Sequence, residues 1–170
     1  NHPKAEANLA ALAEYGETCS LNRVELNGAK VGVITASVAY QYAKDAFPED
    51  ASFLKLGLTY PLPMKLIRDF AAKVETLYII EELEPFMEEQ IRAAGIPCTG
   101  KELTGSLYEL NPQLLAKRVF QRQMPVVDVG IQAVSRPPAL CPGCPHRGFF
   151  YTMYKGKDYV VTGAIGCSTL

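Results

Sequence analysis

The sequence lacks an apolar run of the roughly 18–20 residues that a membrane-spanning helix needs, so we expect no membrane segment. It begins Asn1-His2-Pro3-Lys4, without an initiator methionine and without a basic segment followed by an apolar one. From this start we expect no signal peptide and a chain cut from something longer.

The sequence also lacks a strong charge of either sign, with a net charge of −1 over 170 residues. Nucleic-acid-binding surfaces need an excess of Lys and Arg, so no nucleic-acid partner is expected. The charge is uneven, because residues 131–170 hold four Lys or Arg and one acid, whereas residues 1–130 hold 13 bases and 17 acids. A basic C-terminal part slightly favours an anionic ligand there.

An even set of cysteines is missing as well, since the chain has five, at 19, 98, 141, 144 and 167. An odd count in a chain of this size argues against the disulfide framework of a secreted domain. We therefore expect a cytoplasmic location. Clustered cysteines there indicate metal or redox chemistry, whereas the isolated Cys19 and Cys98 are predicted to be structural.

What the sequence does contain is an alternation of β-branched runs with helical patterns of about ten residues. This alternation predicts an α/β fold with a parallel sheet. Ser37 is expected to cap the second helix and Asn111 the last one. The predicted strands are 30–36, 52–57, 76–81 and a short edge strand at 96–99, and the predicted helices are 4–18, 38–47, 63–73, 85–95 and 112–123.

Three segments are predicted along the chain. Residues 1–124 form the α/β domain, and residues 125–140, with three prolines and no helical period, form a linker. Residues 141–170 hold one predicted helix, roughly 147–155, and one strand, 158–162. Thirty residues are too few for an independent domain, so they are expected to open a second α/β domain.

Candidate chemistry concentrates in the segment Cys141-Pro142-Gly143-Cys144-Pro145-His146-Arg147-Gly148 and in the later Gly163-Ala164-Ile165-Gly166-Cys167-Ser168. A C-x-x-C pair in a Pro/Gly loop brings two sulfurs within reach of one metal or cluster. The glycine lets backbone amides turn toward the sulfurs. Cys167 follows a predicted strand, where α/β sheets bind ligands.

Four interpretations of these cysteines remain open from spacing alone. They are loop cysteines without a cofactor, a zinc site made by Cys141, Cys144, Cys167 and His146, a thioredoxin-like redox pair, or three ligands of an iron–sulfur cluster. The spacing of His146 from Cys144 is awkward for one zinc tetrahedron. The proline-rich segment upstream is a poor match for the strand that a thioredoxin fold needs.

The flanking residues narrow the choice, because the sequence resembles the α subunits of the indolepyruvate ferredoxin oxidoreductase family. The resemblance covers nearly the whole chain and is most specific at 136–148. It rests on Arg136-Pro137-Pro138, the segment 141–148, Val160-Val161-Thr162-Gly163, Ile165-Gly166-Cys167, Val33-Ile34-Thr35, Ala39-Tyr40-Gln41-Tyr42 and Glu81-Glu82-Leu83-Glu84-Pro85-Phe86.

The resemblance implies a transketolase C-terminal-like domain followed by the first elements of a thiamine-diphosphate-binding α/β domain. It implies oxidative decarboxylation of 2-oxoacids, here arylpyruvates such as indolepyruvate, to acyl-CoA with reduction of ferredoxin. The implied cofactors are thiamine diphosphate, Mg²⁺ and a 4Fe–4S cluster. The implied partners are the remaining domains of the parent chain, a β subunit, ferredoxin, coenzyme A and the 2-oxoacid, within an oligomer.

The resemblance also assigns site residues. Cys141, Cys144 and Cys167 are implied cluster ligands, and His146, Gly166, Cys167 and Ser168 are implied contacts of thiamine diphosphate. The sequence departs from the family at Ala164, where an aspartate is usual, and at Ala36-Ser37, where a Ser-Gly pair is common.

Other parts of the family's machinery are expected outside residues 1–170. These are the magnesium-binding motif, the glutamate that activates thiamine, the fourth cluster ligand and the C-terminal cysteine runs. No catalytic residue is therefore assigned within the chain, and the isolated chain is predicted to be inactive.

Two alternatives accompany these predictions. The adjacent Glu81 and Glu82 suggest acid–base catalysis, but a structural role at a strand end, facing a helix or a partner domain, is favoured. As an alternative function for the whole chain, a zinc-stabilised or metal-free α/β domain would serve subunit assembly without catalysis.

Overall fold

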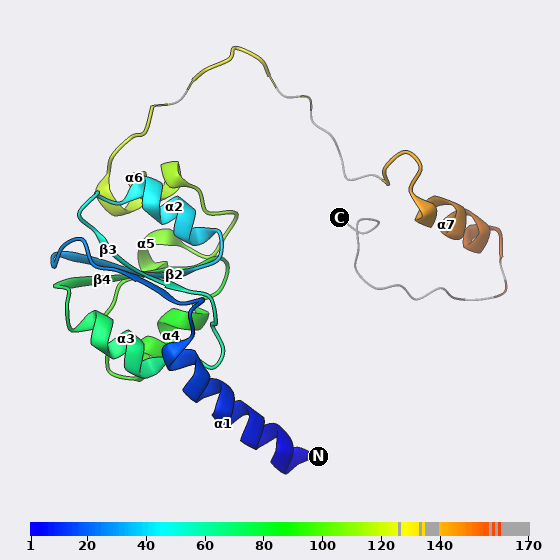
Figure 1. The fold of residues 1–170 in the computed structure, drawn as a ribbon. Helices are drawn as coiled ribbons and strands as arrows, with labels where there is room; N and C mark the ends of the chain where they lie inside the picture. Colours follow the sequence, from blue (N-terminus) through cyan, green and yellow to red (C-terminus); the bar gives the residue numbers. More distant parts are fainter. Residues whose placement is uncertain (126, 133, 135–139, 157, 159, 161–170) are drawn as a thin grey trace. The chain divides into compact units, whose positions relative to one another are not determined.

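The structure, a computed structural model, describes residues 1–125, 127–132, 134, 140–156, 158 and 160 (Figure 1). The chain divides into two compact units, Asn1–Val126 and Val127–Leu170. Across the described residues, no helix is both long enough and apolar enough to cross a membrane. Most of the strand predicted at 158–162 lies outside the described residues.

The first unit is an α/β fold in which helices cover both faces of one mostly parallel sheet, as the alternating pattern predicted (Figure 1). Its strands are β1 (Arg23–Glu25), β2 (Val31–Ala36), β3 (Ser52–Leu56) and β4 (Thr76–Ile80). Its helices are α1 (His2–Thr18), α2 (Ala39–Ala46), α3 (Met64–Ala71), α4 (Phe86–Ala93), α5 (Lys101–Thr104) and α6 (Pro112–Phe120).

The strand order is β1-β3-β2-β4, with β2 parallel to both of its neighbours. Ala36 at the end of β2 pairs with Leu56 at the end of β3, and Thr35 pairs with Ile80 at the end of β4. The carboxyl ends of the three strands therefore lie at one edge of the sheet, which we call the carboxyl edge.

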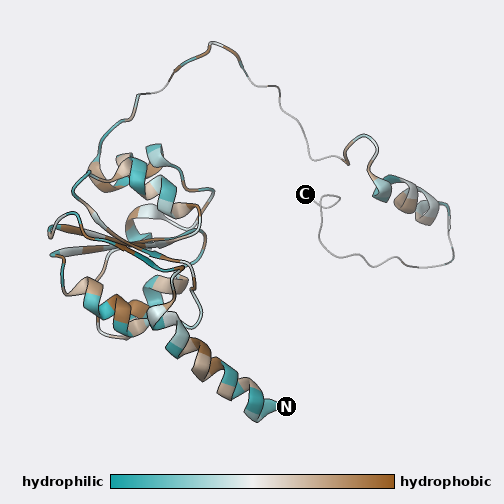
Figure 2. Cartoon of the chain, in the orientation of Figure 1, coloured by the Kyte–Doolittle hydropathy of each residue, from teal (hydrophilic) through white to brown (hydrophobic). Residues whose placement is uncertain are grey.

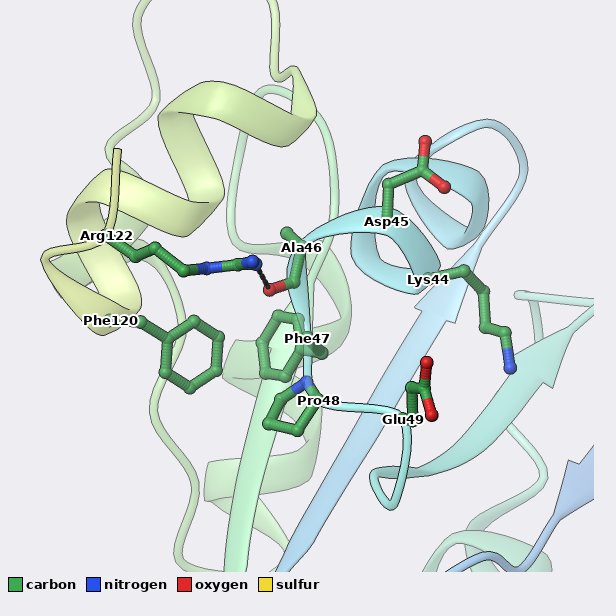
Figure 3. Close-up of a pocket in the computed structure, with 8 residues that line it drawn as sticks. All are labelled: Lys44, Asp45, Ala46, Phe47, Pro48, Glu49, Phe120 and Arg122. Carbon is green, nitrogen blue, oxygen red and sulfur yellow. Dashed lines mark hydrogen bonds between the residues drawn. The ribbon is translucent and has the colours of Figure 1, made fainter. Parts of the chain in front are cut away.

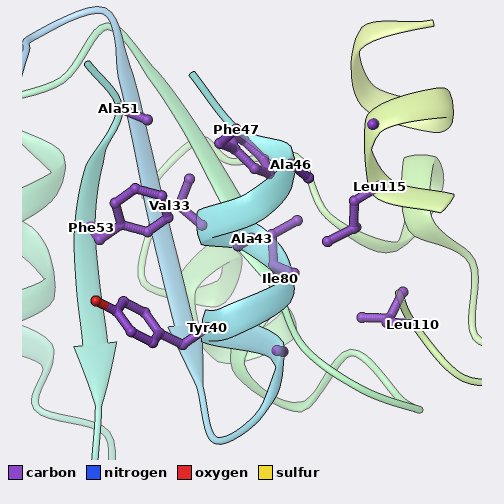
Figure 4. Packing of buried hydrophobic residues seen from close by; sticks show 12 residues of the cluster. Val33, Tyr40, Ala43, Ala46, Phe47, Ala51, Phe53, Ile80, Leu110 and Leu115 are labelled. Atoms are coloured by element: carbon purple, nitrogen blue, oxygen red, sulfur yellow. The ribbon is translucent and has the colours of Figure 1, made fainter. Parts of the chain in front are cut away.

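The sheet separates two apolar layers. On one face, α2 and α6 pack on Val33, Phe53 and Ile80 (Figure 4). On the other face, α3 and α4 pack on Ile34, Leu54 and neighbouring residues. Burial on both faces explains why β2 reads as a continuous β-branched run rather than as an alternating one. Figure 2 shows hydrophobic residues along the central strands.

The start of α2 differs from the prediction. Ser37 was expected to cap this helix, but it adopts a positive φ of 52° in the turn after β2, and the N-cap is Val38. No side chain caps α2. The helix also buries Tyr40 and its alanines, while Val38 is exposed. By contrast, the Asn111 cap is confirmed, since its Oδ1 accepts a hydrogen bond from the Leu114 amide at 2.8 Å.

The two edges of the sheet were predicted less well. The antiparallel β1 was not predicted, because its three residues include two charged ones and form no apolar run. The edge strand predicted at 96–99 is reduced to one parallel bridge between Tyr78 and Thr99. The Thr99 carbonyl accepts a hydrogen bond from the Ile79 amide at 2.8 Å, so this segment still extends the sheet beyond β4.

Two buried hydroxyl groups in the sheet have opposite surroundings. Ser52 Oγ donates to the Gly28 carbonyl at 2.6 Å and accepts from the amides of Asn27 and Gly28 at 3.0 and 3.2 Å. Thr35 Oγ1 is fully buried in β2 and has no hydrogen-bond partner within the described structure. A buried polar group without a partner carries an uncompensated desolvation cost.

We predict opposite effects on stability when each hydroxyl is removed. Thr35→Val should raise the free energy of unfolding by roughly 1 kcal/mol, because an unpaired buried hydroxyl is replaced by a methyl group of similar shape. Ser52→Ala should lower it by about 1–3 kcal/mol, because the Asn27 and Gly28 amides lose their acceptor. Urea unfolding of the 170-residue chain measures both, and a loss of stability in Thr35→Val would contradict the account.

Candidate functional site

The C-x-x-C segment is a tight turn that leads directly into a helix of the second unit. The Cys144 amide donates to the Cys141 carbonyl at 3.1 Å, and Gly143 adopts a positive φ of 79°, which a glycine takes without strain. The helix α7 (Pro145–Lys155) then begins, with Cys144 as its N-cap. It starts two residues before the predicted Arg147, because proline is favoured in the first turn.

Cys144 and His146 lie against each other at this helix start. Cys144 Sγ is 3.5 Å from His146 Nδ1, and the His146 ring stacks on Phe150 with ring centroids 6.2 Å apart. Cys144 is half-buried and Cys141 is exposed, so both thiols are reachable. The structure therefore brings three of the predicted site residues, Cys141, Cys144 and His146, into one short loop.

The donors of this loop suit a soft metal or an iron–sulfur cluster. The two thiols flank one tight turn. The free amides at the start of the helix that follows favour the negative charge that thiolate-bound clusters carry. Gly166, Cys167 and Ser168 lie outside the described residues, so their placement beside the loop stays a prediction. Among the described residues, no three His, Cys, Asp or Glu side chains gather around a common point.

Helix α7 buries none of its residues. Phe149, Tyr151 and Tyr154 expose between 56% and 85% of their surfaces. Helices of this length gain most of their stability from packing an apolar face against other elements. The aromatic residues of α7 therefore form a surface suited to being covered by more protein.

In the first unit, the carboxyl edge has the geometry in which α/β sheets bind ligands or partners. The chain leaves β2 toward α2 on one face of the sheet and leaves the adjacent β4 toward α4 on the opposite face. In open α/β sheets, ligands bind at the carboxyl ends of strands where the chain changes direction in this way.

Glu81, directly after β4, has a structural position at this edge. Its two carboxylate oxygens accept hydrogen bonds from the amides of Met87 at 2.8 Å and Glu88 at 3.0 Å, in the first turn of α4. A carboxylate there satisfies amides that lack helical partners and meets the positive end of the helix dipole. The favoured structural role, facing a helix, is confirmed for Glu81.

Burial raises the pKa of Glu81, against the opposing effect of the Met87 and Glu88 amides and of Lys101. Lys101 Nζ donates to the Glu81 backbone carbonyl at 2.5 Å, and burial lowers the pKa of this lysine. Lys101 was not singled out from the sequence, because no local pattern relates it to a carbonyl twenty residues away.

An open pocket of about 560 Å³ lies between the ends of α2 and α6 (Figure 3). Phe47 and Phe120 line it, with Lys44 and Arg122 offset by Asp45 and Glu49. Arg122 is already bonded to the Ala46 carbonyl at 2.6 Å. With balanced charges and an occupied arginine, the pocket does not indicate a particular ligand.

Comparisons with known proteins agree on one group of relatives. Indolepyruvate oxidoreductase subunit IorA of Thermococcus kodakarensis is 33% identical over 99% of this chain and 30% of the relative. The same subunit from Methanothermobacter thermautotrophicus is 30% identical over 99% of this chain and 31% of the relative. The subunit from Pyrococcus horikoshii is 30% identical over 99% of this chain and 30% of the relative.

A solved structure is also similar in part. The 2-oxoglutarate:ferredoxin oxidoreductase from Magnetococcus marinus, with 2-oxoglutarate, coenzyme A and succinyl-CoA bound, is 19% identical with a TM-score of 0.46. The match covers 59% of this chain and 19% of that chain. No protein-family model matches the chain.

The first unit is an α/β domain, and the cysteine loop lies at the start of a helix in the second unit. The relatives show which group of proteins this combination belongs with. The resemblance predicted from the sequence is confirmed, and the chain is related to the IorA subunits of indolepyruvate oxidoreductases. It spans about 30% of the length of the curated relatives that it matches.

The raised pKa of Glu81 predicts how stability depends on pH. The folded chain binds the Glu81 proton more tightly than the unfolded chain, so this group favours folding most below its ordinary pKa of about 4.3. The advantage is lost as the pH rises through the raised pKa. The stability of the wild-type chain relative to Glu81→Gln should therefore fall from pH 3 to pH 8.

Urea unfolding at several pH values measures this difference. Glu89→Gln, which removes an exposed carboxylate of the same helix, is the matched control. A wild-type advantage over Glu81→Gln that grows as the pH rises would show that burial does not dominate at this carboxylate.

Proposed function

We propose that this chain is the part of a 2-oxoacid:ferredoxin oxidoreductase subunit that joins a transketolase C-terminal-like domain to the start of its thiamine-diphosphate-binding domain. Under this proposal, residues 1–124 are the first domain, 125–140 the linker and 141–170 the start of the second. The carrying observation is the similarity to IorA subunits over 99% of the chain, with the C-x-x-C loop placed directly at a helix start.

We assign the site residues as follows. Cys141 and Cys144 ligate a 4Fe–4S cluster together with Cys167, and His146, Gly166, Cys167 and Ser168 contact thiamine diphosphate. When bound, thiamine diphosphate with Mg²⁺ supplies the electron sink for decarboxylation, and the cluster supplies an electron acceptor.

The described residues have supporting tasks in this proposal. Gly143, at its positive φ, lets the backbone turn between the two cysteines. Cys144 at the N-cap sets its sulfur beside the positive end of the α7 dipole. His146 is held by its contacts with Cys144 and Phe150, which limits its ring orientation.

The reaction that we propose is the oxidative decarboxylation of arylpyruvates, such as indolepyruvate, to acyl-CoA in the cytoplasm. Its partners are the remaining domains of the parent chain, a β subunit, ferredoxin and coenzyme A, within an oligomer. The unburied aromatic residues of α7 support this part of the proposal, because further protein is needed to cover them.

One observation favours a second candidate function. The 3.5 Å contact between Cys144 Sγ and His146 Nδ1 places an imidazole nitrogen beside the thiol pair, as a zinc site would require. In that case the chain would be a zinc-stabilised α/β domain for subunit assembly, without a redox role.

The proposed activity predicts that the full-length parent protein is active and that the 170-residue chain alone is not. The full-length parent, purified without oxygen together with its β subunit, should reduce ferredoxin when given indolepyruvate and coenzyme A. The 170-residue chain alone should show no turnover, because the activating glutamate and the magnesium ligands are assigned outside it. The loss of visible absorbance as ferredoxin is reduced measures the turnover of the parent complex and of the 170-residue chain.

Phenylpyruvate and 2-oxoglutarate are the comparison substrates for this assay. The proposal expects aryl substrates to react faster than 2-oxoglutarate. Absence of turnover with every 2-oxoacid by the parent complex would overturn the proposed function, and turnover by the fragment would overturn its division of labour.

A further inference from the structure

Exposed apolar side chains gather on the loops that follow the carboxyl ends of the parallel strands. Val38 follows β2, Tyr60 follows β3, and Leu83 and Phe86 follow β4. The Tyr60 and Phe86 rings are 6.4 Å apart, which joins the loops after β3 and β4 into one surface. The large exposed hydrophobic residues of these loops, of the start of α4 and of the next loop are Val38, Tyr60, Leu83, Phe86, Leu107 and Tyr108, which we call the carboxyl-edge surface.

The loop that carries Leu107 and Tyr108 is held at the same edge. The Leu110 amide donates to Glu82 Oε2 at 3.3 Å, two residues after the end of β4. Exposure across the surface ranges from 45% at Val38 to 91% at Tyr108. Side chains that project this far are suited to a protein surface rather than to the concave pocket that binds a small molecule.

The loops that carry the apolar residues of this edge hold acidic charge. The loops 37–38, 57–63, 81–85 and 105–111 contain four glutamates and no Lys or Arg. Of these glutamates, Glu84 and Glu109 are exposed. Two lysines lie next to these loops: Lys101, whose ammonium group is bonded to the Glu81 carbonyl, and the exposed Lys65 in the first turn of α3.

The opposite edge of the sheet has a different character. Its loops, 26–30, 47–51 and 72–75, hold both lysines and acids. Among the described residues of these loops, Leu26 is the one large hydrophobic side chain that is exposed. The combination of aromatic residues with acidic charge is therefore particular to the carboxyl edge, and is not a general property of this unit.

We propose that the carboxyl-edge surface binds a separate polypeptide whose contact face carries Lys or Arg among apolar side chains. Projecting Tyr, Phe and Leu residues form the apolar centre of such an interface, and complementary charges around it direct association. The inference goes beyond the proposed function, because it rests on the exposure and charge of the first unit alone.

A second copy of the chain fits the surface less well. A second copy docking by the same face would place acidic loops against acidic loops, and such like-charge contacts are unfavourable. A segment of the parent chain is the other occupant that the crosslinking experiment distinguishes, because it would give crosslinks within the parent chain. A partner that associates from solution can leave the Glu84 and Glu109 carboxylates at a wet, charged rim.

Site-specific photo-crosslinking in the full-length parent protein tests the proposal. The probe, p-benzoylphenylalanine, replaces Leu83 or Tyr108, with Lys73 on the opposite edge as the control position. Both substituted positions are exposed, so the fold should tolerate the probe. We expect positions 83 and 108, but not 73, to crosslink the same separate polypeptide at a segment that contains Lys or Arg next to apolar residues.

Charge reversal then tests the chemistry of recognition. The double variant Glu84→Lys/Glu109→Lys should reduce the crosslink yield about tenfold, because two rim attractions become repulsions. Lys73→Glu should leave the yield unchanged, and circular dichroism melting checks that each variant is folded.

Three results would overturn the inference. They are crosslinks at 83 and 108 no more frequent than at 73, crosslinks to the same surface of a second copy, and crosslinks within the parent chain itself. Unchanged yield in the folded double variant would overturn the assigned basic character of the partner.

Discussion

The fold of the first unit depends on β2 being a central strand that is buried on both faces. Its parallel pairing with β3 and β4 aligns the carboxyl ends of three strands, so the loops after them meet at one edge. Double-sided burial also requires helices on each face, and α2 and α4 supply them on opposite sides. The unpaired Thr35 hydroxyl is a cost of this burial that the surrounding apolar contacts offset.

Because the strand ends meet at the carboxyl edge, polar side chains there can hold the neighbouring loops by hydrogen bonds. Glu81 ties the end of β4 to the start of α4, and Lys101 and the Leu110 amide are drawn to the same short segment. The hydrogen bonds that fix these loops leave their apolar side chains projecting outward. The buried acids at this edge therefore hold the loops in place, whereas the exposed residues of the same loops remain available for contact with other molecules.

The sequence was informative where a pattern is local. Apolar runs predicted the three parallel strands, Asn111 predicted a helix cap, and Cys141 to Gly148 predicted both a turn and a family resemblance. Features that depend on distant partners could not be predicted in this way. The strand β1 is too short and charged to form a pattern, Ser37 lost its cap position to the turn after β2, and the Lys101 contact joins residues far apart in the chain. Of the predicted site, the structure describes the half formed by Cys141, Cys144 and His146.

The central claim is that the loop from Cys141 to His146 holds an iron–sulfur cluster within a 2-oxoacid oxidoreductase. The most direct measurement is the iron and acid-labile sulfide content of the full-length parent, purified without oxygen, in Cys141→Ser/Cys144→Ser and in the control Cys98→Ser. The account predicts a loss of roughly four iron atoms per chain in the double variant, the content of one such cluster, and no loss in the control. Unchanged iron in the double variant, or the loss of one zinc instead, would contradict it.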